Sequence, residues 1–409
     1  MKVDMEFIIN KWKNSNNIED FQLYICNPFC PTVCSFCAYK GTKYNKEDHN
    51  YYQNVYLREL VLSYSDILNS KKIKSIFFGG GTPNLFDPGS LSEICRIIPN
   101  FKNIISKQFE IHPAICSVEY IDFLSGLGIT CLLFGVQSFN SYYLKKQNRP
   151  FADFSHVKKL IDRAKEKMMF TSVDLICYFN YVSKEDLEQF ENDLRMVKEL
   201  QPDVICLQSN YCFNNFNEHG KIYDKEYLIS VEEPFINIVK KHLSNSNYRW
   251  ILEGEFDILQ KKLQSKSLRF VDKRISKEDF YSRVYGYFFD GLISKRRSNT
   301  LGIGSFGSQM VPTRSWICDE IEYVEINDNW KPSFYVIYDN SKQKSYENLI
   351  LDEIGEIGEP PLGFELTFKT FIDKDSYTKS LDCSAKWDPN NKTHVDYIEK
   401  IKRIKQSSG

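Results

Sequence analysis

Three cysteines stand close together near the start of the chain, in the order Cys30, Cys34 and Cys37. The C-x-x-x-C-x-x-C spacing places three thiolates on one short loop, and three such thiolates can hold three irons of a [4Fe–4S] cluster. The fourth iron then has no ligand from this loop, so a small molecule can bind it. A zinc site is the alternative, but structural zinc sites have four ligands, commonly in C-x-x-C pairs, and no second pair follows. The spacing therefore predicts a catalytic iron–sulfur site.

Composition narrows the class of protein. The chain has 409 residues and a formal net charge of −1, which argues against a nucleic-acid binder held by a general positive field. It has no apolar run of membrane-spanning length, and its first residues lack the apolar core of a signal peptide. We therefore expect a cytoplasmic protein whose 12 cysteines are thiols or metal ligands rather than disulfides.

Basic residues gather in residues 261–274 and 295–297. A solvated loop is the first interpretation of these stretches, and a pocket for an anionic substrate is the alternative.

The first half of the chain alternates between apolar runs and amphipathic stretches. Strands are expected over residues 22–27, 73–78, 108–112, 131–137, 170–178 and 204–209, with helices over 51–68, 90–98, 117–127, 153–167 and 183–200. Six such units predict an α/β fold, an open, partial (β/α)6 barrel around a parallel sheet. In barrels of this kind the chemistry lies at the carboxyl ends of the strands.

After residue 210 the alternation weakens. We expect a helix over residues 232–243, a strand over 250–256, a basic irregular stretch to about 298 and a glycine-rich turn over 301–307. A hairpin is expected over 321–326 and 333–338, and a charged helix over 397–405. The predicted organisation is an N-terminal extension (1–21), the partial barrel (22–210), a barrel extension (211–309) and a C-terminal accessory α+β domain (310–409).

Aromatic residues surround the cysteines, with Tyr24 and Phe29 before them and Phe36 directly before Cys37. With this loop, and with further motifs over about half of the chain, the sequence resembles the radical S-adenosylmethionine (SAM) superfamily. Within it, the sequence looks like the HemN-like branch of the oxygen-independent coproporphyrinogen oxidase. The resemblance implies a partial barrel, a [4Fe–4S] cluster and at least one SAM.

Each further motif carries one or more implied SAM-binding residues. The glycine motif Gly79-Gly80-Gly81-Thr82-Pro83 is implied to contact the methionyl amino group through Gly80, Gly81 and Thr82, because glycine allows close backbone approach. Arg149, after Asn148, is implied to pair with the SAM carboxylate, which suits a guanidinium. Asp174 is implied to hold the ribose hydroxyls. The remaining residues implied at the site are Glu110, Gln137, Tyr24, Phe36, Asn210 and Gly304.

The sequence departs from the branch at several positions. Cys26 replaces the family histidine two residues after the tyrosine, and Tyr39 replaces a fourth cysteine. Residues 179–181 (Phe-Asn-Tyr) replace a usual Gly-Leu-Pro. Cys26 is interpreted as a buried strand residue, with exchange into the cluster as the alternative. These departures weigh against coproporphyrinogen decarboxylation.

The resemblance implies reductive cleavage of SAM to a 5′-deoxyadenosyl radical, with an electron donor such as flavodoxin or ferredoxin. The predicted reaction uses a second SAM, near Gly304, to methylate or cyclopropanate an sp2 carbon of a small molecule. Tetrapyrrole chemistry and a haem-trafficking protein without SAM turnover are the alternatives. Five aromatic residues could line a pocket for a planar substrate or form a core stripe: Tyr281, Tyr285, Tyr287, Phe288 and Phe289. No nucleic acid or membrane partner is expected.

Overall fold

The structure is a computed structural model that describes part of the chain. The described residues are 2–15, 18–37, 41–176, 184–208, 234–235, 237–243, 246–251, 255–257, 262–265, 267–276, 279, 299–304, 313–317, 321–328, 331–339 and 365–368. Several predictions lie outside them: those for Tyr39, residues 179–181, Asn210, the aromatic residues 281–289 and the helix over 397–405. No helix within the described residues is both long and apolar enough to cross a membrane.

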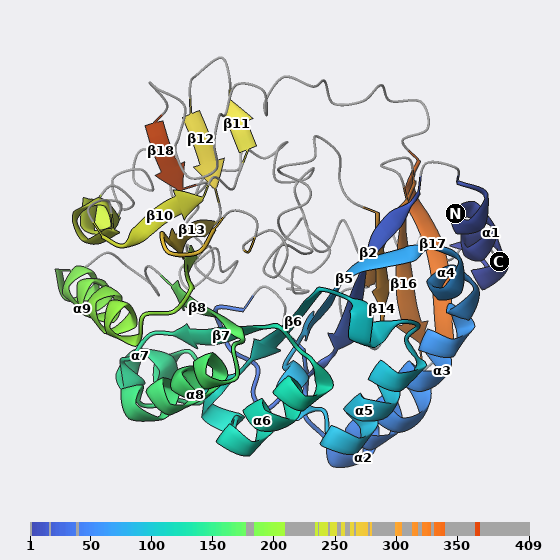
Figure 1. Cartoon of the computed structure of the whole chain (residues 1–409), viewed down its shortest axis with the longest axis horizontal. Helices are drawn as coiled ribbons and strands as arrows, with labels where there is room; N and C mark the ends of the chain where they lie inside the picture. Colours follow the sequence, from blue (N-terminus) through green and yellow to red (C-terminus); the bar gives the residue numbers. More distant parts are fainter. Residues whose placement is uncertain are drawn as a thin grey trace, which may run out of the picture.

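Six parallel strands form the centre of the main sheet, as the alternation predicts. They are β2 (Asp20–Asn27), β5 (Lys72–Gly80), β6 (Ser106–Ile111), β7 (Cys131–Gln137), β8 (Phe170–Ile176) and β9 (Val204–Gln208), adjacent in that order. The helical segments that follow or join them are α2 (Lys46–Tyr51), η1 (Tyr52–Tyr56), α3 (Leu57–Ser63), α4 (Ser65–Ser70), α5 (Pro88–Ile97), α6 (Val118–Leu127), α7 (Ser141–Lys146), α8 (Phe154–Glu166) and α9 (Lys184–Leu200). Figure 1 shows most of these helices as an outer layer along the curved sheet.

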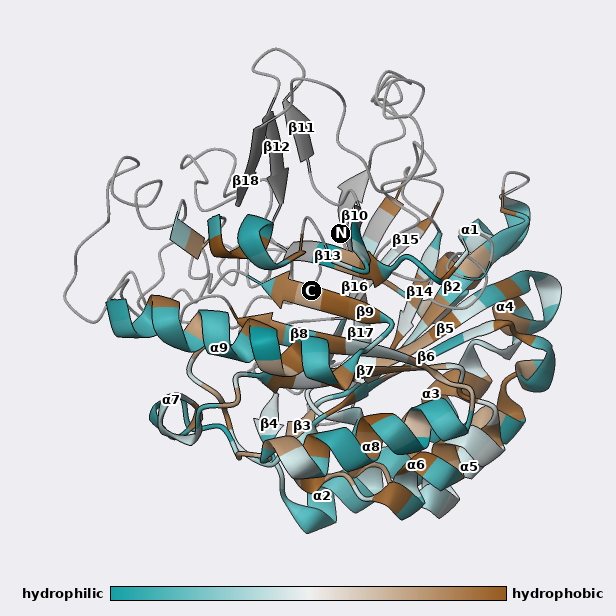
Figure 2. Cartoon of the chain, turned by 60° about the vertical axis from the view of Figure 1, so that its left-hand side comes forward, coloured by the Kyte–Doolittle hydropathy of each residue, from teal (hydrophilic) through white to brown (hydrophobic). Residues whose placement is uncertain are grey.

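Helix α8 shows why the layers form. Val157, Leu160, Ile161 and Ala164 recur at helical spacing and are fully buried, because they face the sheet. Removing an apolar side chain of this size from water contributes about 1.5–3 kcal/mol. In Figure 2 the strands β8 and β9 are hydrophobic, while the helices carry hydrophilic residues on their outer surface. The burial of this one stripe therefore fixes which face of the helix meets the sheet.

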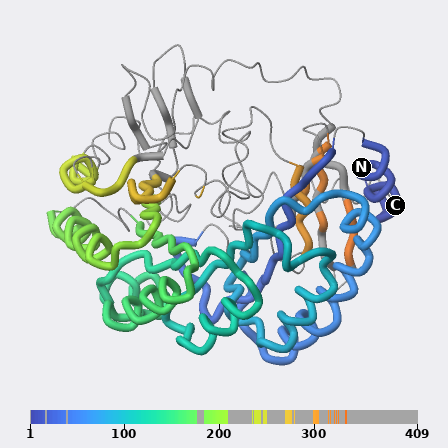
Figure 3. The backbone as a smooth tube through the Cα atoms, in the orientation of Figure 1, coloured from blue at the N-terminus to red at the C-terminus, as the bar shows by residue number. Residues whose placement is uncertain are grey.

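The main sheet extends beyond the six central strands on the side of β2. Strand β14 (Thr300–Ile303) pairs in parallel with β2, and the sheet continues through β15 (Thr313–Ile317), β16 (Ile321–Asp328), β17 (Lys331–Asp339) and β1 (Lys2–Val3). Helix α1 (Met5–Asn14) lies beside these strands, so the first described residues meet the segment formed by residues 300–339 (Figure 3). The predicted β16–β17 hairpin is confirmed. The predicted turn over 301–307 is wrong at residues 301–303, which are strand.

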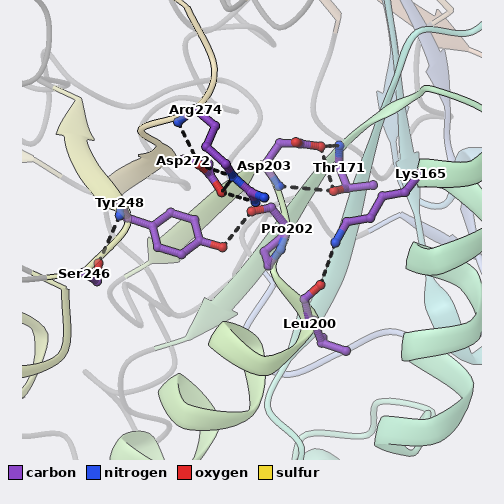
Figure 4. Close-up of polar contacts among 9 residues, drawn as sticks. All are labelled: Lys165, Thr171, Leu200, Pro202, Asp203, Ser246, Tyr248, Asp272 and Arg274. Carbon is purple, nitrogen blue, oxygen red and sulfur yellow. Dashed lines mark hydrogen bonds and ion pairs between the residues drawn. The ribbon is translucent and has the colours of Figure 1, made fainter.

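On the other side, β13 (Ser267–Asp272) and β10 (Tyr248–Ile251) add antiparallel to β9. Polar contacts hold β10 and β13 beside β9, near the end of β13 and the start of β9 (Figure 4). The Tyr248 hydroxyl donates to the Pro202 carbonyl at 2.7 Å, and Arg274 pairs with the buried Asp272 at 2.6 Å. The Asp272 amide also donates to the Asp203 carbonyl at 2.9 Å. The expectation of an irregular stretch to residue 298 is therefore wrong for β13.

Smaller sheets and helical turns complete the described part. Strands β11 (Glu255–Asp257), β12 (Lys262–Ser265) and β18 (Glu365–Phe368) form a separate sheet, and β3 (Phe29–Cys30) pairs with β4 (Thr42–Lys43). The short turns are η2 (Pro83–Leu85), η3 (Phe101–Asn103) and η4 (Pro113–Ile115).

Two local predictions need correction. The helix expected to begin at Ser90 begins at Pro88 instead, and its cap is Asp87, whose carboxylate accepts from the Ser90 amide at 2.9 Å. Pro88 at the first helical position suits that earlier start, because its missing amide hydrogen has no partner there in any case. The single helix expected over residues 51–68 is a series of shorter segments with a π-helical turn at Tyr52–Tyr56.

Candidate active site

The carboxyl ends of the central strands bring the predicted polar residues to one face of the sheet. Glu110 lies opposite Leu133, and Asp174 lies opposite Gly135. Side chains alternate along a strand, and the next residue after Glu110, Ile111, packs in the hydrophobic core between sheet and helices. Glu110 therefore faces the opposite, inner side of the curved sheet. Tyr24 of β2 is half-buried and stacks on Phe77 with ring centroids 5.6 Å apart.

The loop with the three cysteines is fixed from one side by the segment after α7. The Ser35 amide donates to the Gln147 carbonyl at 3.0 Å, and the Asn148 amide nitrogen Nδ2 donates to the Val33 carbonyl at 3.1 Å. The Ser35 hydroxyl also donates to the Gln147 side chain. Residues more than 100 positions apart thus form one unit, which holds the cysteine loop against the end of β7.

Arg149 joins this loop to the sheet. Its guanidinium lies 3.7 Å from the Cys34 sulfur, donates to the Gly135 carbonyl and stands 5.7 Å from the centre of the Phe36 ring. Phe36 in turn packs against Leu144 and Ile176. Arg149 therefore sits between the cysteine loop and the end of β7, where it can reach an anionic group of a bound molecule.

The glycine motif packs against the other side of the cysteine loop. A Cβ on Gly81 would lie 2.6 Å from the Phe29 carbonyl and 2.9 Å from the Cys30 sulfur, so only glycine fits. Gly80 has φ +106°, a conformation that L side chains rarely adopt. The Thr82 hydroxyl hydrogen-bonds Cys30 and acts to lower the pKa of that thiol, although burial raises it overall.

Two carboxylates share the inner side of the sheet. Burial and, to a smaller extent, the neighbouring charge of Asp174 raise the pKa of Glu110, while the Gly80 amide and Arg269 act in the opposite direction, and the resulting pKa is about 8. Arg269 on β13 is buried and lies opposite Cys206, which itself lies opposite Asp174. The interpretation of the basic stretch as a solvated loop is therefore wrong for Arg269.

The residues present fit a cluster and SAM. Several polar atoms on the inner side are buried and have no hydrogen-bond partner within the described part of the chain; they are Gln137 Oε1, Ser172 Oγ and both ring nitrogens of His112. Such atoms cost free energy unless a ligand satisfies them. In the same part of the chain, no group of at least three metal-ligating side chains is positioned to hold a single metal ion. The thiolates of a [4Fe–4S] cluster bind different irons and need not converge on one ion.

The remaining predicted residues are placed as follows. Gly304 follows β14 with φ +97°, and a Cβ there would lie 2.3 Å from the Tyr52 hydroxyl and 2.9 Å from the Cys26 carbonyl. Cys26 is fully buried in β2, in agreement with the interpretation as a strand residue. Sequence reasoning missed His112 and Ser172, and it included Arg269 only in a basic stretch that was interpreted first as a solvated loop. Strand alternation from Glu110 and Asp174 was the available signal for the first two, because it places them on the same face.

A buried carboxylate anchors the segment between β7 and α7. Asp193 of α9 accepts from the Ser138 hydroxyl at 2.6 Å and from the Phe139 amide at 2.9 Å. Burial nevertheless raises the pKa of Asp193 from its ordinary 3.8 to about 6. The ionised form is thus less favourable in the folded chain than in the unfolded one.

This shift predicts a pH dependence of stability. A raised carboxyl pKa contributes stability that is fully present below about pH 4 and is lost as the pH rises through about 6. About two pKa units correspond to about 3 kcal/mol. Denaturant titrations measure the difference in the free energy of unfolding between the wild type and Asp193→Asn. This difference should fall by about 3 kcal/mol between pH 4 and pH 7. The control is Asp122→Asn, because Arg163 lowers the pKa of Asp122 and its contribution does not fall with rising pH. A constant difference for Asp193→Asn would contradict the assignment.

Comparisons with known proteins agree with this geometry. The family model of the radical SAM superfamily matches residues 24–194. The oxygen-independent coproporphyrinogen III oxidase of Helicobacter pylori (strain ATCC 700392 / 26695) is 25% identical over 299 residues, 71% of this chain and 62% of that protein. The heme chaperone HemW of Haemophilus influenzae is 27% identical over 191 residues, 45% of this chain and 49% of the relative. This chain thus spans less than two thirds of the length of either relative.

A solved structure shares the fold. Coproporphyrinogen III oxidase (HemN) from Escherichia coli, a radical SAM enzyme, superposes with a TM-score of 0.60 at 18% identity and covers 79% of this chain and 70% of its own. The predicted α/β fold class is therefore confirmed. Members of the radical SAM family use a [4Fe–4S] cluster and SAM. Residues 24–194 thus match the radical SAM family, and the chain is similar to HemN-like and HemW-like proteins.

Proposed function

We propose that this protein is a radical SAM enzyme that holds a [4Fe–4S] cluster on Cys30, Cys34 and Cys37 and cleaves SAM reductively. The single observation that carries the proposal is the contact of Arg149 with both the cysteine loop and the end of β7. This contact places the Arg149 guanidinium, a cation that suits the SAM carboxylate, beside the three cysteines whose spacing suits a cluster. Flavodoxin or ferredoxin is the class of electron donor that we propose.

The chain's own residues bind and orient SAM in this proposal. Arg149 pairs with the methionyl carboxylate, the backbone at Gly80 and Gly81 approaches the methionyl amino group, and Asp174 accepts from the ribose hydroxyls. Glu110 and Gln137 contact SAM from the ends of β6 and β7, and burial on the inner side excludes water. A cluster held by Cys30, Cys34 and Cys37 would supply, when reduced, the electron needed to break the sulfonium C–S bond of SAM into methionine and the 5′-deoxyadenosyl radical.

For the fate of the radical, we propose carbon alkylation with a second SAM, giving a methylated or cyclopropanated sp2 carbon of a planar small molecule. The second SAM binds near Gly304 in this proposal. The backbone of Gly304 supports that location, because it lies beside Cys26 at the ends of β14 and β2. Cys26 and Tyr39 also replace residues that the coproporphyrinogen oxidase pattern carries.

The second candidate is tetrapyrrole chemistry, favoured by the names of the relatives. They include coproporphyrinogen III oxidase and, over 31% of this chain at 29% identity, the anaerobilin synthase of Escherichia coli O157:H7. The HemW relatives support a third candidate of another class, a haem chaperone without SAM turnover.

The test is an anaerobic incubation of the reduced, cluster-loaded protein with methyl-labelled SAM. 5′-Deoxyadenosine is expected in every case, and S-adenosylhomocysteine beside it in the presence of a methyl-accepting planar substrate. If S-adenosylhomocysteine never forms while coproporphyrinogen loses carbon dioxide, tetrapyrrole chemistry replaces alkylation. Tight haem binding with no 5′-deoxyadenosine would instead identify a chaperone and overturn the enzyme proposal.

A further inference from the structure

His112 is a buried histidine that follows β6 directly. Its side chain is 7% exposed, and neither ring nitrogen has a hydrogen-bond partner within the described residues. Leaving a buried polar group without a partner costs about 1–3 kcal/mol. Polar atoms in this state commonly face a water molecule or a ligand. His112 therefore needs an explanation that the fold alone does not give.

The backbone holds His112 in one orientation. Its amide donates to the Asn84 side-chain oxygen at 2.8 Å, and the Asn84 amide nitrogen donates to the His112 carbonyl at 3.2 Å. With φ −88° and ψ 105° the residue is extended, so the alternation of β6 continues through it. Ile111 packs in the hydrophobic core, and His112 therefore faces the same inner side as Glu110.

The surroundings of His112 point to an anionic ligand. Burial, and then the nearby charge of Arg149, holds the pKa of His112 well below its usual range, although a contact of the ring with the residue's own backbone acts in the opposite direction. The ring is thus neutral, with one N–H donor and one acceptor nitrogen. By the register of β6 and β7, Gly135 of β7 is the neighbour of His112 on the next strand. A Cβ added to Gly135 would lie 3.1 Å from the Arg149 guanidinium and 3.1 Å from the Gln137 amide nitrogen. A cation, an amide and an imidazole donor thus converge at the ends of β6 and β7.

We propose that His112 is a SAM-binding residue whose ring N–H donates to the methionyl carboxylate, beside Arg149. A carboxylate has two oxygens and about four acceptor positions, so one guanidinium does not saturate it. The inference rests on the proposed SAM site, because Arg149 serves as carboxylate partner there.

The test compares the affinity of the cluster-loaded protein for SAM and for decarboxylated SAM, measured by equilibrium titration at neutral pH. His112→Phe should weaken SAM binding by about tenfold or more, the range for a hydrogen bond to a charged group. It should leave the affinity for decarboxylated SAM unchanged, because that ligand lacks the acceptor. His112→Gln, whose amide offers a donor of similar reach, should stay within about threefold of the wild type for SAM.

His49→Phe is the matched control. His49 is also buried, has a ring nitrogen without a partner in the described residues, and packs on Phe29, Tyr44 and Phe86. Its substitution should change neither affinity. Equal weakening of both ligands by His112→Phe, or no weakening of either, overturns the inference, and His112→Leu replaces the variant if His112→Phe does not fold. Absence of SAM binding in the wild type would instead overturn the proposed function and this inference with it.

Discussion

Replacement of Cys34 by alanine is expected to abolish the iron–sulfur cluster and SAM cleavage together. Cys34 stands at the centre of the C-x-x-x-C-x-x-C loop, and its sulfur contacts Arg149 at 3.7 Å. Two remaining thiolates leave a second iron without a protein ligand, so the cluster should not persist through reconstitution and desalting. We expect the broad visible absorbance and the electron paramagnetic resonance signal of the reduced cluster to disappear. Production of 5′-deoxyadenosine should fall by more than about a thousandfold, because the reaction loses its reductant.

The control for this experiment is Cys95→Ala. Cys95 lies in α5, is 4% exposed and belongs to the hydrophobic core. Its loss should lower the free energy of unfolding slightly and leave the absorbance of the reconstituted protein unchanged. If Cys34→Ala retained the wild-type spectrum and iron content, Cys34 would not be a cluster ligand.

Gly81→Ala is expected to damage the same site without removing any ligand. The added methyl group would meet the Phe29 and Pro28 carbonyls at 2.6 and 2.9 Å and the Cys30 sulfur at 2.9 Å. Two of these atoms are backbone and cannot move aside cheaply, so the cysteine loop must shift. Overpacking of this kind costs about 1–3 kcal/mol. We expect iron incorporation to fall to less than about half and SAM affinity to fall about tenfold or more, since displacement near a binding site has such effects.

Gly126→Ala in α6 is the matched substitution. A Cβ there meets no atom within 4 Å, and replacing a helical glycine by alanine stabilises by about 0.5–1 kcal/mol. The two glycine variants should therefore change thermal stability in opposite directions, and only Gly81→Ala should lose iron. Equal iron content in both proteins would show that the close packing at Gly81 does not position Cys30.

The sequence was sufficient to predict the central barrel because its signals are local. The helix α6 begins after Ser117 as predicted, since the Ser117 hydroxyl caps the Tyr120 amide within one turn. The strands β13 and β14 were missed because their signals are long-range. Thr300–Ile303 is a four-residue run that contains a glycine, and its pairing with residues 22–25 and with β15 makes it a strand. His112 was missed for a similar reason, because the missing hydrogen bonds of its ring depend on tertiary packing. The domain boundaries near 210 and 310 stay predictions.

The position of β2 has a consequence for how this protein can be divided. The strand that delivers the cysteine loop is hydrogen-bonded on both sides, to β5 and to β14. A fragment that ends before Thr300 would convert β2 into an edge strand with a row of exposed amide and carbonyl groups. Such edges are templates for intermolecular pairing and aggregation. A fragment cut to residues 24–194 would therefore lack the strand that protects its first strand, and we expect such a fragment to aggregate more readily than the whole chain.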